Sequence, residues 1–446
     1  MRTPIADFVR AYANSGSVRL HMPGHKGKAF LGCEPLDITE INGADVLYSA
    51  HGIIDESERN ASHLFKTAHT YYSTEGSTLA IKAMLMLAMQ SRKSDTPPVV
   101  LAARNVHRAF ISAAALIDFS VEWLYPAKTE SLCECIVSAD AVEGVLRNMP
   151  SLPFAVYITS PDYLGNIADV EGIARVCERH GLPLLVDNAH GAYLAFTSPT
   201  LHPIALGAAM CVDSAHKTLP VLTGGAYLHI SEQFSRYAEN ARSALSLFAS
   251  TSPSYLVLQS LDLCNAYLAD SYTERLSEFV KGLELAKQKI RSIGFSIRLS
   301  EPLKIVLDTV EFGYTGNEVA QFLRENNIEA EYADEKFVTL MLTPENDGED
   351  ISRLLLALAS LEKREPIKEP DYPPLKPTEQ VISIREAVFS PRRRVNVTDS
   401  VGKICADAAI SCPPAIPIAI SGERITEDLA ALLTAYGINE IAIVDC

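Results

Sequence analysis

The sequence predicts an α/β fold with a mostly parallel sheet that helices cover on both faces. Short apolar runs and helical patterns alternate from Val99 onward, as in strands that are joined by helices. These segments are 99–102, 109–116, 154–158, 173–177 and 182–186. Polar clusters follow several of the runs, at the carboxyl ends of strands, where folds of this kind bind their ligands.

Length and charge limit the classes of protein that the chain can represent. Its 446 residues predict two or three domains with ample core. The net charge of −16 argues against general affinity for nucleic acid or anionic membranes and is compatible with cationic small substrates. Nine cysteines without regular spacing suit a reducing cytosol. With no apolar signal core and no membrane-spanning stretch, the sequence predicts a cytoplasmic protein.

The first 45 residues form an arm in this interpretation. A short helical pattern is followed by an irregular loop, 21–27, in which proline and glycine separate His21 from His25. The two imidazoles therefore do not share a helix face, and a metal site is not expected. A loop that combines His, Gly and Lys favours a role near a ligand or a subunit boundary.

A candidate phosphate site lies at the start of an apolar helix. Gly76, Ser77 and Thr78 precede the run 79–88. Exposed amides and the positive end of a helix dipole suit a phosphate there. The alternative is an ordinary helix cap.

Three polar clusters follow strands, at 104–108, 159–165 and 187–192. Together with the stretch 213–220 they are expected to meet in a single crevice, because the carboxyl ends of parallel strands lie at one edge of the sheet.

Lys217 is the central residue of the stretch 213–220. An apolar run precedes it and Gly224-Gly225 follows. A desolvated lysine loses proton affinity and becomes an amine nucleophile that can form a Schiff base with an aldehyde cofactor. The alternative is a surface lysine on a loop.

The later part of the chain predicts smaller domains. Leu276, Phe279, Val280, Leu283 and Ile290 fall on one face of a long helix. Beyond it, strands at 304–307 and 337–342 flank a helix at 317–326. A proline-rich linker covers 365–378. The predicted division is an arm at 1–45, a large domain at 46–270, a small α/β domain at 271–364 and a C-terminal domain at 379–446.

The clusters together suit pyridoxal 5'-phosphate (PLP) chemistry. Lys217 would hold the aldehyde, and Asp187 would pair with the pyridine nitrogen and keep it protonated, so that the ring accepts electrons from the substrate. His107 would lie flat over the ring, and His190 would lie near it. The residues predicted to contact the phosphate are Gly76, Ser77, Thr78, Ser214 and His216.

Six motifs carry a resemblance to a known family. They are Leu20-His21-Met22-Pro23-Gly24-His25-Lys26-Gly27, Glu75-Gly76-Ser77-Thr78, Arg104-Asn105-Val106-His107, Ser160-Pro161-Asp162-Tyr163-Leu164-Gly165, Asp187-Asn188-Ala189-His190-Gly191 and Ser214-Ala215-His216-Lys217-Thr218. In order and spacing the chain closely resembles the ornithine/lysine/arginine decarboxylase family of aspartate-aminotransferase fold.

This resemblance implies a PLP-dependent transferase-like large domain with a mostly parallel sheet, and smaller α+β C-terminal domains. It implies the same site roles for Lys217, Asp187, His107 and His190, and phosphate contacts from Ser77, Thr78, Ser214 and His216. It further implies polyamine biosynthesis and a homodimer whose active sites lie at the subunit boundary, where the loop from His21 to Lys26 contributes.

The chain departs from the family pattern in two places. It starts directly at the core, without the N-terminal wing of the larger enzymes, so large rings are not expected. Cys412 and Ala415 stand where the family tends to have tyrosine and glycine, which puts substrate recognition in doubt. Glu423 is a candidate ligand for the distal cationic group of the substrate, or else a solvated turn acid. His25 is a further candidate for substrate contact.

The sequence therefore predicts decarboxylation of lysine, arginine or ornithine to the amine and carbon dioxide. A second hypothesis keeps the fold and cofactor but makes the enzyme an aminotransferase or lyase, with Arg298 or Arg324 binding the α-carboxylate. A third is a non-catalytic relative, against which intact Lys217, Asp187 and His107 argue.

Overall fold

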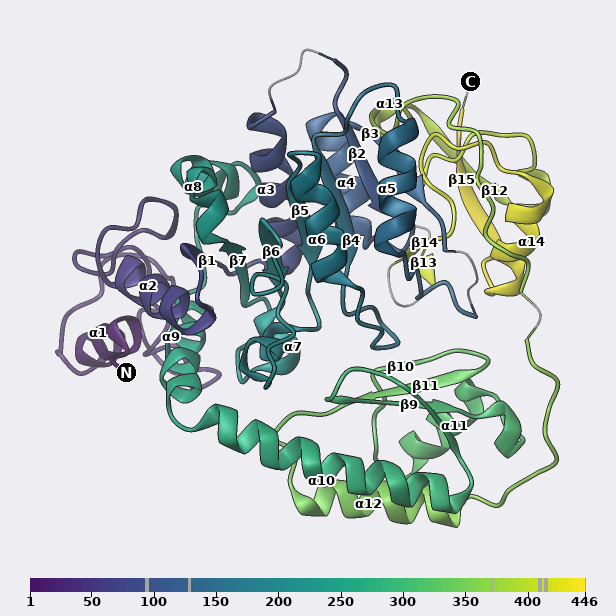
Figure 1. Cartoon of the computed structure of the whole chain (residues 1–446). Helices are drawn as coiled ribbons and strands as arrows, with labels where there is room; N and C mark the ends of the chain where they lie inside the picture. Colours follow the sequence, from purple (N-terminus) through teal and green to yellow (C-terminus); the bar gives the residue numbers. More distant parts are fainter. Residues whose placement is uncertain (93–95, 127–129, 371, 408–410, 413–415, 446) are drawn as a thin grey trace. The chain divides into compact units, whose positions relative to one another are not determined.

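The computed structural model describes residues 1–92, 96–126, 130–370, 372–407, 411–412 and 416–445. The chain divides into two compact units, and Figure 1 labels the helices and strands of both. The first comprises Met1–Thr96, Ser151–Ile158 and Val170–Glu274, and the second comprises Pro97–Pro150, Thr159–Asp169 and Arg275–Cys446. The finer division into four segments that the sequence predicts stays a prediction.

The first unit contains a twisted sheet with the strand order β1-β7-β6-β5-β4. The strands are β1 (His69–Ser73), β4 (Ala155–Thr159), β5 (Leu184–Asp187), β6 (Met210–Asp213) and β7 (Ala226–Ile230). The helices of this unit are α1 (Pro4–Ala13), α2 (Ile53–Phe65), α3 (Gly76–Gln90), α6 (Val170–Arg179), α7 (Ala215–Thr218), α8 (Ala238–Phe248) and α9 (Tyr255–Ala269).

The pairing of β5 and β6 positions the candidate site. The two strands are parallel, and Asp187 at the end of β5 is in register with Val212 of β6. Both strands are buried along their length, as their apolar sequences require. The residues that follow them, Asn188 and Ser214, therefore leave the sheet at the same edge. Strand β7 pairs with β6 in the antiparallel direction and brings Gly224 and Gly225 to this edge.

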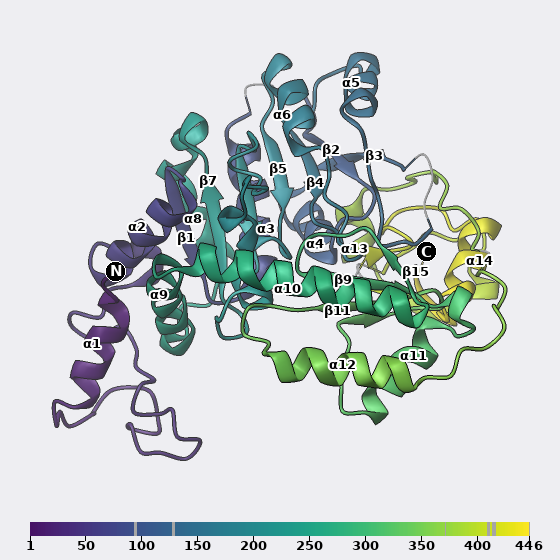
Figure 2. The same cartoon turned by 60° about the horizontal axis from the view of Figure 1, so that its bottom comes forward.

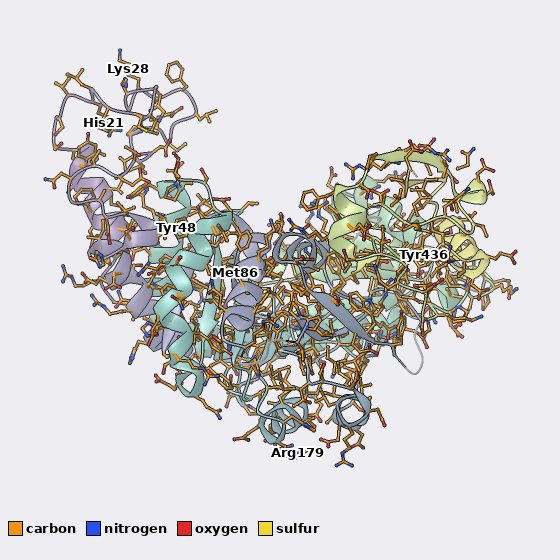
Figure 3. The ribbon with its side chains drawn as sticks, turned by 90° about the horizontal axis from the view of Figure 1, so that it is seen from above. His21, Lys28, Tyr48, Met86, Arg179 and Tyr436 are labelled. Atoms are coloured by element: carbon orange, nitrogen blue, oxygen red, sulfur yellow. The ribbon has the colours of Figure 1, made fainter. Side chains whose placement is uncertain are left out.

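The N-terminal arm extends beyond α1 as an irregular loop (Figure 2). His21 and Lys28 lie on this loop (Figure 3). Internal hydrogen bonds order it, because the Arg19 guanidinium donates to the carbonyl of Pro35 and the Glu34 carboxylate accepts from the amides of Leu31 and Gly32. Its apolar side chains nevertheless face solvent: Leu20 and Leu31 are each 90% exposed.

The second unit contains the parallel pair β2 (Val99–Ala103) and β3 (Ser120–Leu124), with α4 (Arg108–Ile117) between them in sequence. A four-stranded antiparallel sheet has the order β10-β11-β9-β8. Its strands are β8 (Ser296–Arg298), β9 (Lys304–Asp308), β10 (Tyr332–Ala333) and β11 (Phe337–Met341). The other elements of this unit are α5 (Ala139–Asn148), α10 (Tyr272–Ile293), α11 (Gly316–Glu325), α12 (Gly348–Ser360), α13 (Ile384–Phe389), β12 (Arg392–Asn396), β13 (Ser411–Cys412), β14 (Ile416–Pro417), α14 (Glu427–Ala435) and β15 (Glu440–Val444).

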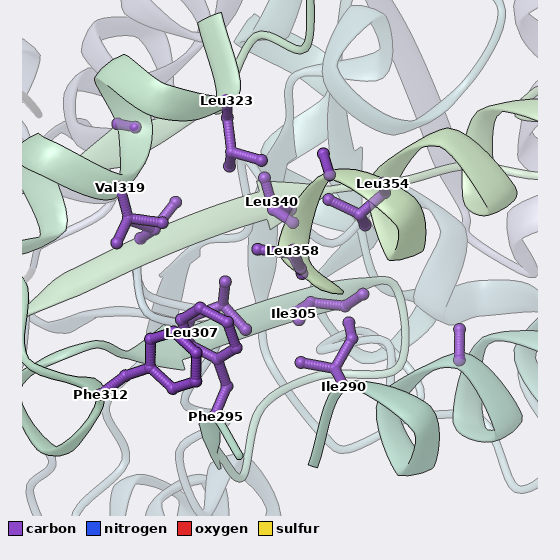
Figure 4. Close-up of a cluster of buried hydrophobic side chains, with 14 of the residues drawn as sticks. Ile290, Phe295, Ile305, Leu307, Phe312, Val319, Leu323, Leu340, Leu354 and Leu358 are labelled. Atoms are coloured by element: carbon purple, nitrogen blue, oxygen red, sulfur yellow. The ribbon is translucent and has the colours of Figure 1, made fainter. Parts of the chain in front are cut away.

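Helices α10, α11 and α12 cover one face of the four-stranded sheet and form its core (Figure 4). Ile290 of α10, Leu307 of β9 and Leu323 of α11 are fully buried in it. Helix α11 begins with a capping box, in which Thr315 and Glu318 satisfy each other's backbone amides. Apolar periodicity and caps therefore act together to place this helix.

The predicted fold class is confirmed. Predicted strands at 99–102, 154–158, 304–307 and 337–342 correspond to β2, β4, β9 and β11, and the helix predicted at 317–326 is α11. In the part of the chain that the structure describes, no helix has both the length and the apolar character needed to cross a membrane.

Truncating the buried side chain of Leu307 should destabilise the second unit. We expect Leu307→Ala to lower the free energy of unfolding by about 2–5 kcal/mol, because lost burial and a cavity both contribute. The matched control is Leu299→Ala, since Leu299 is 90% exposed in the same unit. Urea unfolding followed by circular dichroism should show a lower midpoint for the first variant only. Equal midpoints would contradict the assigned core.

Candidate active site

Asp187 is a buried carboxylate at the carboxyl end of β5, with 2% of its surface exposed. Tyr157 of β4 donates its hydroxyl to Oδ2 at 3.3 Å, and the amide of Ala189 donates to Oδ1 at 3.2 Å. Burial raises the pKa of Asp187, and the nearby charge of Lys217 opposes this shift. The site therefore offers a desolvated acceptor that a cationic donor would stabilise.

Lys217 lies on the single turn of α7, and its side chain is half-buried. Its Nζ is 3.0 Å from Nε2 of His190. His190 is buried and belongs to the turn that follows Asp187 at the end of β5. The structure thus brings together three of the residues that the sequence singles out.

The start of α3 faces the stretch that carries Lys217. Ser214 donates its hydroxyl to Oγ of Ser77 at 2.9 Å, and the amide of Gly76 donates to the carbonyl of Gly224 at 2.7 Å. Gly76 has a φ of 72°, and no atom lies within 4 Å of the position that a Cβ would take. Ser77 and Thr78 occupy the first turn, whose amides have no partner inside the helix.

His216 is next to Lys217 on α7. Its Nδ1 donates to the carbonyl of Gly225 at 2.9 Å, which assigns the proton of the neutral ring to that nitrogen. Burial lowers the pKa of His216, so the ring is neutral before an anion is bound. A phosphate at Nε2 would increase its proton affinity.

His107 belongs to the second unit, where it caps α4. Its Nδ1 accepts from the amide of Ala109 at 3.1 Å. The other ring nitrogen is not used by this cap. The predicted position of His107 over the cofactor ring stays a prediction.

Glu423, the candidate substrate ligand, is 1% exposed in the second unit. Its Oε2 accepts from the amide of Ile420 at 2.8 Å and lies 3.6 Å from the guanidinium of Arg104, which is also buried. Arg104 further donates to the carbonyls of Pro417 and Ile418. Glu423 thus has a structural partner that the sequence did not indicate, and its role toward the substrate stays a prediction.

His25, the other candidate for substrate contact, lies in the arm. Its Nε2 is 3.2 Å from Oδ2 of Asp37, and its Nδ1 accepts from the amide of Gly27. These contacts orient the ring within the arm. Ala415, one of the two C-terminal residues that differ from the family pattern, lies outside the described residues.

Sequence reasoning assigned no role to Tyr157 or to the pair Asn188 and Asp213, although the two latter residues lie in its motifs. Tyr157 sits inside an apolar strand, where the pattern predicts burial but names no partner. Asp213 directly precedes Ser214 at the end of β6 and accepts a hydrogen bond from Asn188 at 2.6 Å. In the sequence, Asp213 could have been noticed as a carboxylate at the end of an apolar strand.

Solved structures share this fold. The constitutive lysine decarboxylase of Escherichia coli matches with a TM-score of 0.80 at 17% identity, covering 100% of this chain and 82% of that one. The Francisella novicida lysine decarboxylase LdcF matches with a TM-score of 0.83 at 16% identity, covering 99% and 81%. The chain therefore has the α/β fold of this structural class.

The chain belongs to the Orn/Lys/Arg decarboxylase family, because the model of that family's major domain matches residues 3–310. An arginine decarboxylase of Halalkalibacterium halodurans is 29% identical over 97% of this chain and 93% of that protein. An arginine decarboxylase of Bacillus subtilis is 28% identical over 96% and 92%. The family predicted from the motifs, with decarboxylation of a basic amino acid as its activity, is confirmed.

Replacing Glu423 should reveal its structural contribution. We expect Glu423→Gln to lower the free energy of unfolding by about 2–3 kcal/mol, because Arg104 would remain buried without its counter-charge. The control is Glu379→Gln, which makes the same change in an exposed pair with Arg424 and should have little effect. Thermal unfolding measures both. Unchanged stability together with a large increase in KM would instead assign Glu423 to the substrate.

Proposed function

We propose that this protein is a PLP-dependent decarboxylase that converts lysine, arginine or ornithine to the corresponding amine and carbon dioxide. The observation that carries this proposal is the 3.0 Å contact between Lys217 Nζ and His190 Nε2, beside the buried carboxylate of Asp187. Family membership and the arginine decarboxylase relatives support the choice of reaction.

The residues of the first unit fit the cofactor. The Asp187 carboxylate is desolvated and its pKa is raised by burial, so a protonated pyridine nitrogen is the kind of donor that would stabilise its charged form. The open space at Gly76 and the first-turn amides of Ser77 and Thr78 suit a phosphate. Ser214 and His216 adjoin this cradle. We assign these residues to the cofactor and His107 to its ring face.

When bound, PLP supplies an electron sink for the α-carbon of the substrate. Lys217 supplies the amine that attaches the cofactor. Asp187 holds the charge on the pyridine nitrogen. Tyr157 orients Asp187, because its hydroxyl donates a hydrogen bond to Oδ2 of the carboxylate.

The contact between Lys217 and His190 provides a route for a proton. Nε2 of His190 lies within hydrogen-bond distance of Nζ, so a proton can move between the two nitrogens without rearrangement of the backbone. Loss of carbon dioxide must be followed by protonation of the same carbon. We assign this proton to Lys217, with His190 as its partner.

The aminotransferase or lyase hypothesis is less favoured. Its two candidate arginines have other surroundings: Arg298 donates to Glu134 at 2.7 Å, and Arg324 lies exposed on α11, 3.4 Å from Glu329. The relatives with broad coverage and an assigned activity are decarboxylases.

We also propose a cytoplasmic homodimer with a place in polyamine biosynthesis. The described cysteines are free thiols, which suits a reducing compartment. The arm exposes Leu20, Phe30 and Leu31 on an internally ordered loop. Burial of these side chains against a second copy would explain their exposure here and would place His25 near the subunit boundary.

Product analysis tests the proposed reaction. Purified protein with PLP should release carbon dioxide and one amine from a panel of lysine, arginine and ornithine, as measured by chromatography. Lys217→Ala should release none, whereas Lys281→Ala, a change on the exposed face of α10, should retain activity. Stoichiometric amino transfer to a keto acid, or consumption of the amino acids without an amine product, would reject the decarboxylase assignment.

Charging the arm should weaken the dimer. We expect the double variant Leu20→Asp/Leu31→Asp to sediment as a monomer at concentrations where the wild type is a dimer, because the substitutions place charges in an apolar interface. Leu299→Asp, at an equally exposed leucine of the second unit, is the control. Analytical ultracentrifugation measures both. A dimer that tolerates both arm substitutions would exclude the arm from the interface.

A further inference from the structure

A buried polar cluster beside the candidate site has no role in the proposed chemistry. Asp213, at the end of β6, has no exposed surface. Its Oδ2 accepts from Nε2 of His202 at 3.0 Å and from Nε2 of His229 at 3.1 Å. Its Oδ1 accepts from the side-chain amide of Asn188 at 2.6 Å. One carboxylate thus joins the loop before β6, strand β7 and the turn after β5.

The hydrogen bonds assign the protonation of this cluster. An ionised carboxylate only accepts, so Nε2 of His229 donates to Asp213. In the neutral ring Nδ1 then accepts from the hydroxyl of Thr70, 2.8 Å away. Burial lowers the pKa of His229, which favours the neutral ring. Burial alone would raise the pKa of Asp213, but His202 and His229 outweigh it and hold the pKa well below its usual range. Asp213 is therefore a buried anion held by oriented donors.

Asn188 connects this anion to the candidate active site. It directly follows Asp187, and its backbone amide donates to the carbonyl of Val212 at 2.9 Å. Its own carbonyl accepts from the amide of Gly191 at 2.8 Å, which closes the turn that contains His190. A Cβ at position 191 would lie 2.1 Å from Oδ1 of Asn188, so the side chain of Asn188 packs directly against this turn.

The same cluster has the composition of a metal site, since ligand atoms of His202, Cys211 and Asp213 lie within 4.8 Å of one another. The hydrogen bonds argue against that interpretation. Both Nε2 atoms carry protons that are directed at one carboxylate oxygen, and Cys211 Sγ is 3.9 Å from the other oxygen. A metal would require the loss of these protons.

We infer that Asp213 is a positioning residue, which acts through Asn188 to fix the turn that places Asp187 and His190 beside Lys217. This inference rests on the proposed function, since the turn matters only if Asp187 and His190 serve the cofactor. Asp213 itself contacts neither the substrate nor the cofactor in this account. Its carboxylate supplies an anchor that an amide cannot replace, because only a carboxylate accepts from all these donors at once.

Asp213→Asn and Asn188→Ala test this role. Each variant should weaken PLP binding about tenfold, as expected for loss of one buried hydrogen bond to a charged group. Each should also change the visible circular dichroism per bound cofactor, because that signal reports the orientation of the ring. If Asp213 acts through Asn188, the double variant should be little worse than either single variant.

Asp262→Asn is the matched control. Asp262 is likewise a buried aspartate of the first unit, but it accepts from the amides of Ile5 and Ala6 and from the hydroxyl of Ser57. A general loss of packing should affect thermal stability in this variant without changing the circular dichroism of the cofactor. Asn188→Ala retains Asp213 and both histidines. If Asp213→Asn does not fold, this variant alone tests whether the link through Asn188 positions the cofactor.

Several results would overturn the inference. Wild-type cofactor affinity and circular dichroism in both single variants would reject it, as would additive losses in the double variant. Stoichiometric zinc in the purified wild type, measured by elemental analysis, would replace the hydrogen-bonded cluster with a metal site. A wild type that binds no PLP would reject the proposed function itself, whereas normal binding with unaffected variants would reject only the role of Asp213.

Discussion

The site depends on one constraint, the burial of the Asp187 carboxylate at the end of a strand. An isolated buried anion is unfavourable, so its surroundings must supply donors. Tyr157 and the amide of Ala189 supply two, and the charge of Lys217 supplies a favourable field. A protonated pyridine nitrogen would complete this set. The elements around β5 hold these groups in place.

The parallel pairing of β5 and β6 brings most of these groups together. Because Asp187 is in register with Val212, the turn after β5 and the single turn of α7 start at the same edge of the sheet. His190 and Lys217 are then close enough for direct contact. The bond between Ser214 and Ser77 links α7 to the start of α3, so the lysine and the phosphate cradle share one framework. Under the proposed function, short contacts would therefore couple cofactor attachment to phosphate binding.

The sequence predicts the fold class, the family and the chemistry of the motifs, because strand-helix alternation and residues such as Lys217 are local signals. It did not identify Tyr157, whose partner lies on a neighbouring strand. It also assigned no role to Asp213, since the donors that hold this residue come from distant segments. Glu423 shows the reverse case: its motif suggested a ligand contact, whereas its buried pairing with Arg104 depends on residues far apart in the chain.

The central claim is that Lys217 carries the cofactor. Reduction of the PLP-loaded protein with borohydride fixes the cofactor to the lysine that holds it, and peptide mass mapping then locates the added mass. We predict modification at Lys217 alone. Replacement of Lys217 should abolish the label, whereas replacement of Asp187 or His190 leaves the amine unchanged. Labelling of a different lysine, or no labelling of a protein that shows the visible band of bound PLP, would contradict it.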